Sequence, residues 1–155
     1  MSTVTRPPAL RGDWARLAHA TLSDVGHRSG AARASVIVVL EAAPCCLSAQ
    51  EVVERAHERA HPVGVASSYR VLERLHSLEL VRRIDLGDGV ARYEAVNPGE
   101  HRHHHLVCIE CGRIEPFEDA RLERALHATT PPPGFSLIDH EVVMRVRCAV
   151  CGRDR

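Results

Sequence analysis

The sequence predicts an α+β protein with two small domains, and three observations indicate it. Helical patterns fill the first half of the chain, a hairpin pattern follows them, and beyond Pro98 the composition changes sharply to histidines and cysteines. A length of 155 residues suits one ordinary domain or two very small ones. Since 45% of the residues are hydrophobic and 26% are charged, we expect a folded globular chain rather than a disordered one.

Two helices are predicted ahead of residue 61. The first covers residues 28–42 and contains the apolar block Val36–Leu40, which periodicity alone cannot divide between a buried helix and a buried strand. The second begins at a capping box formed by Ser48 and Glu51, and its apolar residues then repeat at helical spacing. Because this second pattern is clear, we favour a helix for the first segment as well.

A third helix is predicted after Pro62 and Gly64, and it has two distinct sides. Its leucines share one stripe, which predicts a face packed in a core. Polar residues are spaced along another stripe: Ser67, Arg70 and Arg74. Such a stripe is most often a solvated surface. The alternative is contact with DNA, because the third helix of a helix-turn-helix lies in the major groove.

A β-hairpin is predicted next, with strands over residues 81–86 and 90–96. The glycines in the intervening Gly87-Asp88-Gly89 tolerate the positive φ that a tight hairpin turn needs. Three helices followed by a hairpin is the element order of a winged helix, so residues 1–96 are predicted to be a winged-helix domain with a helical N-terminal extension. The break at Asn97-Pro98-Gly99 predicts a hinge over residues 97–100.

Residues 101–155 are predicted to form a second, small α+β domain. We expect a strand over residues 103–109, a turn at Cys111-Gly112 and a helix around residues 119–127. A proline-rich loop then leads into a last strand over residues 135–147, which would carry His140 at its start.

Two cysteine pairs, Cys108-x-x-Cys111 and Cys148-x-x-Cys151, supply four thiolates from two turns. Four thiolates are the tetrahedral donor set of a closed structural zinc site, which assigns this site to folding rather than to catalysis. The alternatives are four buried free thiols or two disulfides. A glycine after each pair, Gly112 and Gly152, permits the tight turn that lets both sulfurs face one ion.

The histidine run His101-Arg102-His103-His104-His105 leads directly into a predicted strand. Alternate side chains of a strand point to opposite faces, so His103 and His105 share one face and His104 lies on the other. One run can therefore serve two metal sites. The alternative is a solvated loop or an adventitious metal scavenger.

Further donor groups are available for both faces of this strand. Glu123 and His140 are candidates on the His104 side, while Glu94 and the Cys45-Cys46 pair are candidates on the other. Adjacent cysteines cannot easily ligate one ion together, and buried small hydrophobes are an equally good interpretation of that pair.

Charge and segment patterns limit the function classes. Twenty arginines balance twenty acidic residues, so any DNA binding must be local. The N-terminal residues have no secretory pattern and no stretch approaches the roughly 18 apolar residues of a membrane helix, so we expect a cytoplasmic protein without a membrane partner. In that reducing compartment, cysteines serve as metal ligands or core thiols.

Two other function classes fit the residues less well. A zinc hydrolase would need an arrangement such as H-E-x-x-H and more chain to form a substrate pocket, so we expect no enzyme activity and no small-molecule substrate. A zinc-ribbon interaction module would account for the cysteines but leaves the hairpin and the Tyr69-Arg70 helix without a role.

The sequence resembles the ferric uptake regulator (Fur) family, which includes sensors of iron, zinc, manganese, nickel and peroxide. The motifs that carry the resemblance span nearly the whole chain: Gly26-His27-Arg28 with Arg33, Val65–Leu72, His103–Gly112, Glu123, His140 and Cys148-x-x-Cys151. The resemblance implies a winged-helix DNA-binding domain hinged to a dimerisation domain. It also implies a transcriptional repressor of metal-uptake genes, a homodimer that metal binding closes onto a palindromic double-stranded operator.

The resemblance also implies DNA contacts. Tyr69 would touch thymine methyl groups and Arg70 a phosphate or base edge, while Arg28 would reach into a minor groove. The neighbouring candidates on the same helix are Ser67, Ser68 and Arg74.

Three metal sites are implied in the same way. The four cysteines match the structural zinc site. Glu94, His103 and His105 match three ligands of a sensor site at the hinge, and Cys46 stands where iron regulators have a fourth ligand, a histidine. The residues that match a second site of the dimerisation domain are His104, Glu123 and His140.

Two departures from the family pattern bear on the sensed metal. Arg102 stands where the second site usually has its first histidine, so three alternatives are open for that site: it is three-coordinate, it recruits His101, or it is vacant. Ser77 stands where zinc sensors of the actinobacterial type have an acidic residue. A thiolate among imidazoles and a carboxylate favours zinc as the regulatory ion, as in a zinc uptake regulator. The alternative is an iron(II) or peroxide sensor in which Cys46 is a bystander or becomes oxidised.

Overall fold

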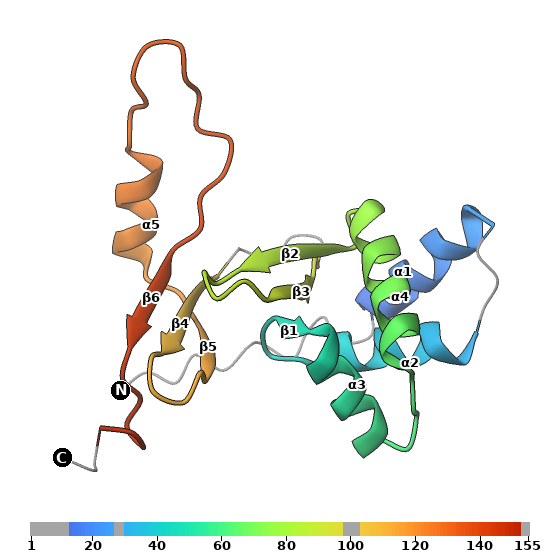
Figure 1. The fold of residues 1–155 in the computed structure, drawn as a ribbon. Coiled ribbons are helices and arrows are strands. Elements are labelled where there is room, and N and C mark those ends of the chain that lie inside the picture. The colour runs from blue at the N-terminus through green and yellow to red at the C-terminus, as the bar shows by residue number, and fades with distance from the viewer. Residues whose placement is uncertain (1–12, 27–29, 98–102, 153–155) are drawn as a thin grey trace. The chain divides into compact units, whose positions relative to one another are not determined.

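The computed structural model describes residues 13–26, 30–97 and 103–152 (Figure 1). The chain divides into two compact units, one within Arg6–Glu100 and the other within His101–Arg155. Each unit contains both helices and strands, which confirms the predicted α+β class. Within the described ranges, no helix combines the length and the hydropathy that crossing a membrane requires.

The N-terminal unit is a winged helix preceded by one further helix. Its helices are α1 (Asp13–Asp24), α2 (Ala31–Ala42), α3 (Ala49–Glu58) and α4 (Val65–Ser77). Its strands are β1 (Leu47–Ser48), β2 (Val81–Asp85) and β3 (Ala91–Ala95), which form an antiparallel sheet in the order β1-β3-β2. The short strand β1 was not predicted, because two residues are too few to show a period.

The apolar block within residues 28–42 belongs to helix α2, as predicted. Val36, Ile37, Val39 and Leu40 are all buried, so this helix packs against its neighbours on most of its circumference. A helix that is apolar nearly all round lies inside a core, and it cannot show a clear amphipathic period in the sequence. The predicted start of the segment, residues 28 and 29, lies outside the described residues.

Helices α3 and α4 begin at the places that the sequence predicted. The Ser48 hydroxyl accepts a hydrogen bond from the Glu51 amide at 3.2 Å, and the Glu51 carboxylate accepts one from the Ser48 amide at 2.8 Å, which completes the capping box. Helix α4 buries Leu72 and Leu75 completely and leaves Tyr69 exposed. The two sides of α4 are therefore a core face and a solvent face.

The C-terminal unit is built on a three-stranded sheet. Its elements are β4 (His104–Cys108), β5 (Ile114–Phe117), α5 (Ala120–His127) and β6 (Val143–Val146). Strand β4 lies in the centre, antiparallel to β5 and parallel to β6. The Asp119 carboxylate caps α5 by accepting the amides of Arg121 and Leu122.

Two features of this unit differ from the prediction. Strand β5 was not predicted, and the last strand covers Val143–Val146 rather than residues 135–147. The last strand is short because its partner β4 begins at His104, so the segment before Val143 meets no strand edge among the described residues. This segment forms the long loop between α5 and β6 in Figure 1, and His140 lies in that loop and not in a strand.

We predict that Ser48→Ala lowers the free energy of unfolding of the N-terminal unit by about 1 kcal/mol, because it removes one half of the capping box. The measurement is urea unfolding followed by circular dichroism. Gln50→Ala is the matched control, since Gln50 is an exposed residue of the same helical turn that caps nothing. Equal losses in the two variants would contradict the capping argument.

Candidate metal centres and the exposed face of α4

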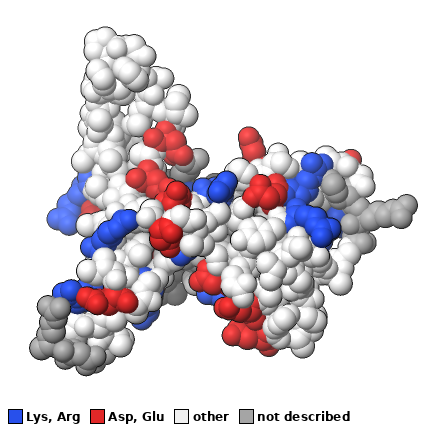
Figure 2. All heavy atoms as spheres, in the orientation of Figure 1, with Lys and Arg blue, Asp and Glu red and all other residues white. Residues whose placement is uncertain are grey.

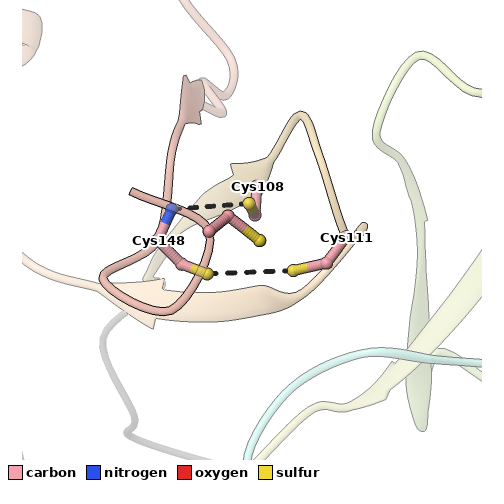
Figure 3. A group of neighbouring side chains, drawn as sticks. Cys108, Cys111 and Cys148 are labelled. Carbon is pink, nitrogen blue, oxygen red and sulfur yellow. Dashed lines mark hydrogen bonds between the residues drawn. The ribbon is translucent and has the colours of Figure 1, made fainter. Parts of the chain in front are cut away.

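The four cysteines of the two Cys-x-x-Cys pairs converge, and Figure 3 labels three of them, Cys108, Cys111 and Cys148. Their sulfur atoms all lie within 4.8 Å of one another. The Cys111 and Cys148 sulfurs are 3.8 Å apart, and the Cys148 amide donates a hydrogen bond to the Cys108 sulfur at 3.4 Å. The parallel register that pairs Cys108 with Val146 explains the convergence, because it places the turn after β4 beside the turn after β6.

The surroundings of these thiols favour a cation. Hydrogen bonds from the amides of Cys111, Cys148 and Glu110 lower the pKa of Cys108 to about 6. By contrast, hydrogen bonds with the Cys148 and Cys111 sulfurs raise the pKa of Cys151 to about 12. Four thiolates this close repel one another, so full ionisation needs a positive charge among them. Four converging sulfurs fit a tetrahedral zinc ion.

A second cluster forms around His104, at the start of β4. His104, Glu123 and His140 each bring a donor atom within 4.8 Å of the others. The Nε2 atoms of His104 and His140 lie 2.7 Å and 3.2 Å from the two Glu123 carboxylate oxygens. His104 Nε2 is buried and makes no aligned hydrogen bond in spite of the short distance. A buried imidazole nitrogen without a hydrogen bond, beside a carboxylate, fits the role of a metal ligand.

The ionisation of Glu123 is consistent with this assignment. Burial opposes ionisation of the carboxyl, but the hydrogen bond with His140 and the charges of His104, His140 and His127 outweigh it and lower the pKa of Glu123. The cluster therefore presents an anionic oxygen between imidazoles.

The residues predicted for the hinge site belong to two different units. In the C-terminal unit the rings of His103 and His105 are 5.2 Å apart. In the N-terminal unit the Cys45 sulfur lies within 4.8 Å of a Glu94 carboxylate oxygen. The Cys46 sulfur is 3.9 Å from that of Cys45. The sequence predicted Cys46 as the thiol ligand, because spacing cannot tell which of two adjacent thiols faces Glu94. In the structure the thiol close to Glu94 is that of Cys45.

Two contacts in the N-terminal unit bear on these candidate ligands. Glu94 pairs with Arg82 across the hairpin, where the guanidinium donates two hydrogen bonds to one carboxylate oxygen at 2.7 and 3.0 Å. Cys46 is buried, and a hydrogen bond with Cys45 together with that burial raises the pKa of its thiol. An ion bound here must compete with Arg82 for Glu94 and displace a proton from a thiol.

The exposed face of α4 holds three of the six predicted DNA-contacting residues, namely Tyr69, Arg70 and Arg74. A shallow hollow there is lined by Tyr69, Arg70, Glu73, Arg74 and Ser77. Figure 2 shows arginine side chains gathered over this part of the N-terminal unit. Tyr69 is 47% exposed, which suits contact with a partner.

The other predicted DNA contacts have different outcomes. Ser67 is half-buried, whereas Ser68 is completely buried and has no exposed atom to offer, so we leave Ser68 out of the interface. Its position on the core side follows from helical spacing, since Ser68 stands four residues before Leu72. Arg28 lies outside the described residues.

Comparison with known proteins agrees with this architecture. A model of the Ferric uptake regulator family matches residues 24–145. The Ferric uptake regulation protein of Bacillus subtilis (strain 168) is 38% identical over 119 residues, which cover 76% of this chain and 80% of the relative. The Ferric uptake regulation protein of Legionella pneumophila is 34% identical over 131 residues, or 84% of this chain and 95% of the relative.

Solved structures show the same fold. The ferric uptake regulator from Pseudomonas aeruginosa with manganese has a TM-score of 0.65 at 29% identity and covers 86% of this chain and 98% of its own. The Helicobacter pylori ferric uptake regulator has a TM-score of 0.75 at 22% identity, with 98% and 97% covered, a likeness of fold. A winged helix followed by a unit built around clustered thiols and imidazoles defines a class of metal-responsive transcription regulators. The chain belongs to the ferric uptake regulator family.

We predict that Cys111→Ser removes tightly held zinc and destabilises the C-terminal unit, because a closed thiolate site contributes folding free energy directly. The purified protein should retain about one zinc per subunit through mild chelation, and the variant should lose it and melt at a lower temperature. Val150→Ala is the matched control, since Val150 is exposed within the second cysteine turn and offers no ligand. Full zinc content and unchanged melting of Cys111→Ser would refute the assignment.

Proposed function

We propose that the protein is a repressor that binds palindromic operator DNA as a homodimer when a regulatory metal ion, zinc by preference, is bound. The observation that carries the proposal is that one chain has both a candidate DNA-binding face, in its N-terminal unit, and clustered metal donors, in its C-terminal unit. An exposed arginine-bearing face lies on α4, and clustered metal donors lie on both sides of β4. A chain of this family that carries both a DNA-binding face and metal donors is expected to repress metal-uptake genes in the cytoplasm.

Dimerisation through the C-terminal unit is supported by its exposed apolar side chains. Phe135 and Ile138 are 75% and 89% exposed. Helix α5 is strongly amphipathic, yet none of its residues is fully buried within the single chain. Apolar groups left open in this way favour burial against a second copy. A two-fold dimer matches a palindromic operator, because each half-site then meets an identical recognition helix.

The hinge residues support a mechanism of control. A divalent ion shared by Glu94 and a thiol of one unit and by His103 and His105 of the other would fix the relative orientation of the two units. The two α4 helices of a dimer must lie about one helical turn of DNA apart to meet both half-sites. Coordination would then increase the population of dimers that fit the operator. By thermodynamic linkage, the affinities for DNA and for metal must rise together.

The donor set supports zinc over iron(II). A thiol beside Glu94 adds a soft ligand to imidazoles and a carboxylate, and soft ligands select zinc over harder ions. The alternative is an iron(II) or peroxide sensor in which neither cysteine binds the ion. Relatives of the same fold were solved with iron and with manganese, so membership of the family leaves the ion open.

We predict that Tyr69→Ala and Arg70→Ala each weaken operator binding by about 1–3 kcal/mol, as expected for the loss of one base or phosphate contact. Metal content and dimerisation should not change, because both side chains lie on the exposed face of α4. The measurement is fluorescence anisotropy on DNA from upstream of the protein's own gene, with Arg59→Ala at the end of α3 as a control. Operator affinity equal to the parent's in both α4 variants would mean that another element reads the DNA.

We predict that Cys46→Ser raises the zinc concentration needed for half-maximal operator binding more than it raises the corresponding iron(II) concentration. A hydroxyl is a poor substitute for a thiolate, and the loss is greater for the softer ion. Cys45→Ser is the matched comparison, since its sulfur lies close to Glu94.

The pair of variants separates three outcomes. A zinc midpoint that moves only in Cys46→Ser supports the predicted ligand, and one that moves only in Cys45→Ser transfers the role to Cys45. Unchanged midpoints in both variants would remove the thiol from the site, and with it the main reason to prefer zinc over iron.

A further inference from the structure

The cluster on the His104 side of β4 is one donor short of a closed tetrahedral site. His104, Glu123 and His140 supply two imidazoles and one carboxylate. A four-coordinate ion held by these three residues would keep an open position for water or for a further protein ligand. The identity of the fourth donor decides how tightly this second site binds and which ions it accepts.

One more imidazole lies next to this cluster. His127 stands one helical turn after Glu123 on α5, and its Nε2 atom is 3.5 Å from Glu123 Oε2. The same carboxylate oxygen is 3.2 Å from His140 Nε2. The rings of His127 and His140 meet edge to face with their centroids 5.2 Å apart. Glu123 Oε2 therefore lies between two imidazoles.

Helix geometry makes this arrangement suitable for coordination. Residues four apart share one face of a helix, and a helical side chain leans back over the turn that precedes it. His127 thus leans over Glu123, and two ligands with this spacing can bind one ion from a single helix. The His127 side chain is 71% exposed, so its ring is free to rotate toward the cluster without disturbing a packed core.

We propose that His127 is the fourth protein ligand of the second site, which then consists of three imidazoles and one carboxylate from a single subunit. This inference rests on the assignment of His104, Glu123 and His140 as a second metal site of the proposed metal-responsive repressor. A site rich in nitrogen donors favours zinc, cobalt or nickel over manganese, which prefers oxygen ligands. His127 is consequently a specificity-determining residue as well as a ligand.

The test is a cobalt(II) titration of protein that holds one zinc ion per subunit, at the structural cysteine site. Binding is followed by the visible absorption of the bound cobalt. All proteins carry His103→Ala, which removes a hinge ligand and leaves the second site as the accessible one. The parent should take up one cobalt per subunit, and His140→Ala should abolish that uptake. Adding His127→Ala should weaken cobalt affinity by at least roughly tenfold and change the visible spectrum, because water replaces an imidazole.

The matched control is His57→Ala, which removes an exposed histidine from the last turn of α3 that belongs to none of the three clusters. Its cobalt affinity and spectrum should equal the parent's. Zinc content should stay at one per subunit in every variant, which shows that the structural site is intact. Manganese competition should become more effective in His127→Ala than in the parent.

Two results would overturn the inference, and they differ in what else they overturn. If His127→Ala keeps the parent's cobalt affinity and spectrum while His140→Ala loses the ion, His127 is no ligand and the second site stands. If the His103→Ala parent takes up no cobalt, His104, Glu123 and His140 form no metal site, and both the inference and the assignment of that second site fail, whereas operator binding through the hinge ion remains a separate test.

Discussion

The pairing of β4 with β6 is the constraint on which the C-terminal unit depends. Among residues 103–152, the fully buried side chains are His104, His105 and Cys108, and each is a candidate metal ligand. A unit of this size buries little apolar surface, so its stability is marginal without a further contribution. A bound ion would supply one, because the parallel register brings the two cysteine turns together. Candidate ligands therefore stand where a larger unit would have an apolar core.

The N-terminal unit is stabilised in the ordinary way. Its buried cluster extends from Trp14 on α1 to Tyr93 on β3, and the Trp14 indole donates a hydrogen bond to the Leu80 carbonyl at 2.9 Å. A core of this kind does not need metal, so helix α4 keeps its exposed face whether or not an ion is bound. Under the proposed function, regulation would therefore act on the spacing of the two α4 helices of a dimer rather than on the formation of the helix itself.

The parts of this structure that the sequence predicted are those whose signals are local. The capping box joins two residues three positions apart, Ser48 and Glu51, and it forms as predicted. Each Cys-x-x-Cys pair has the same spacing, and the sulfur atoms of the two pairs come together. The last strand was predicted too long because its extent depends on where its partner β4 begins, which no pattern within residues 135–147 records. His127 was missed, and Cys45 could not be preferred to Cys46, for a related reason: the proximity of Cys45 to Glu94 and of His127 to His140 arises from packing between separate elements.

The cysteine site and the hinge residues differ in how readily they would bind an ion. The four thiols lie in turns that the pairing of β4 with β6 brings together, so these ligands are held in place and would bind zinc tightly. At the hinge, an ion must displace Arg82 from Glu94 and a proton from a buried thiol, and both costs lower its affinity. Under the proposed function, the cysteine site would therefore fill first, and the hinge residues would respond only when metal is more abundant. A metal-responsive regulator needs that order, because an ion that is required for folding must stay bound when the metal concentration falls and so cannot signal that fall.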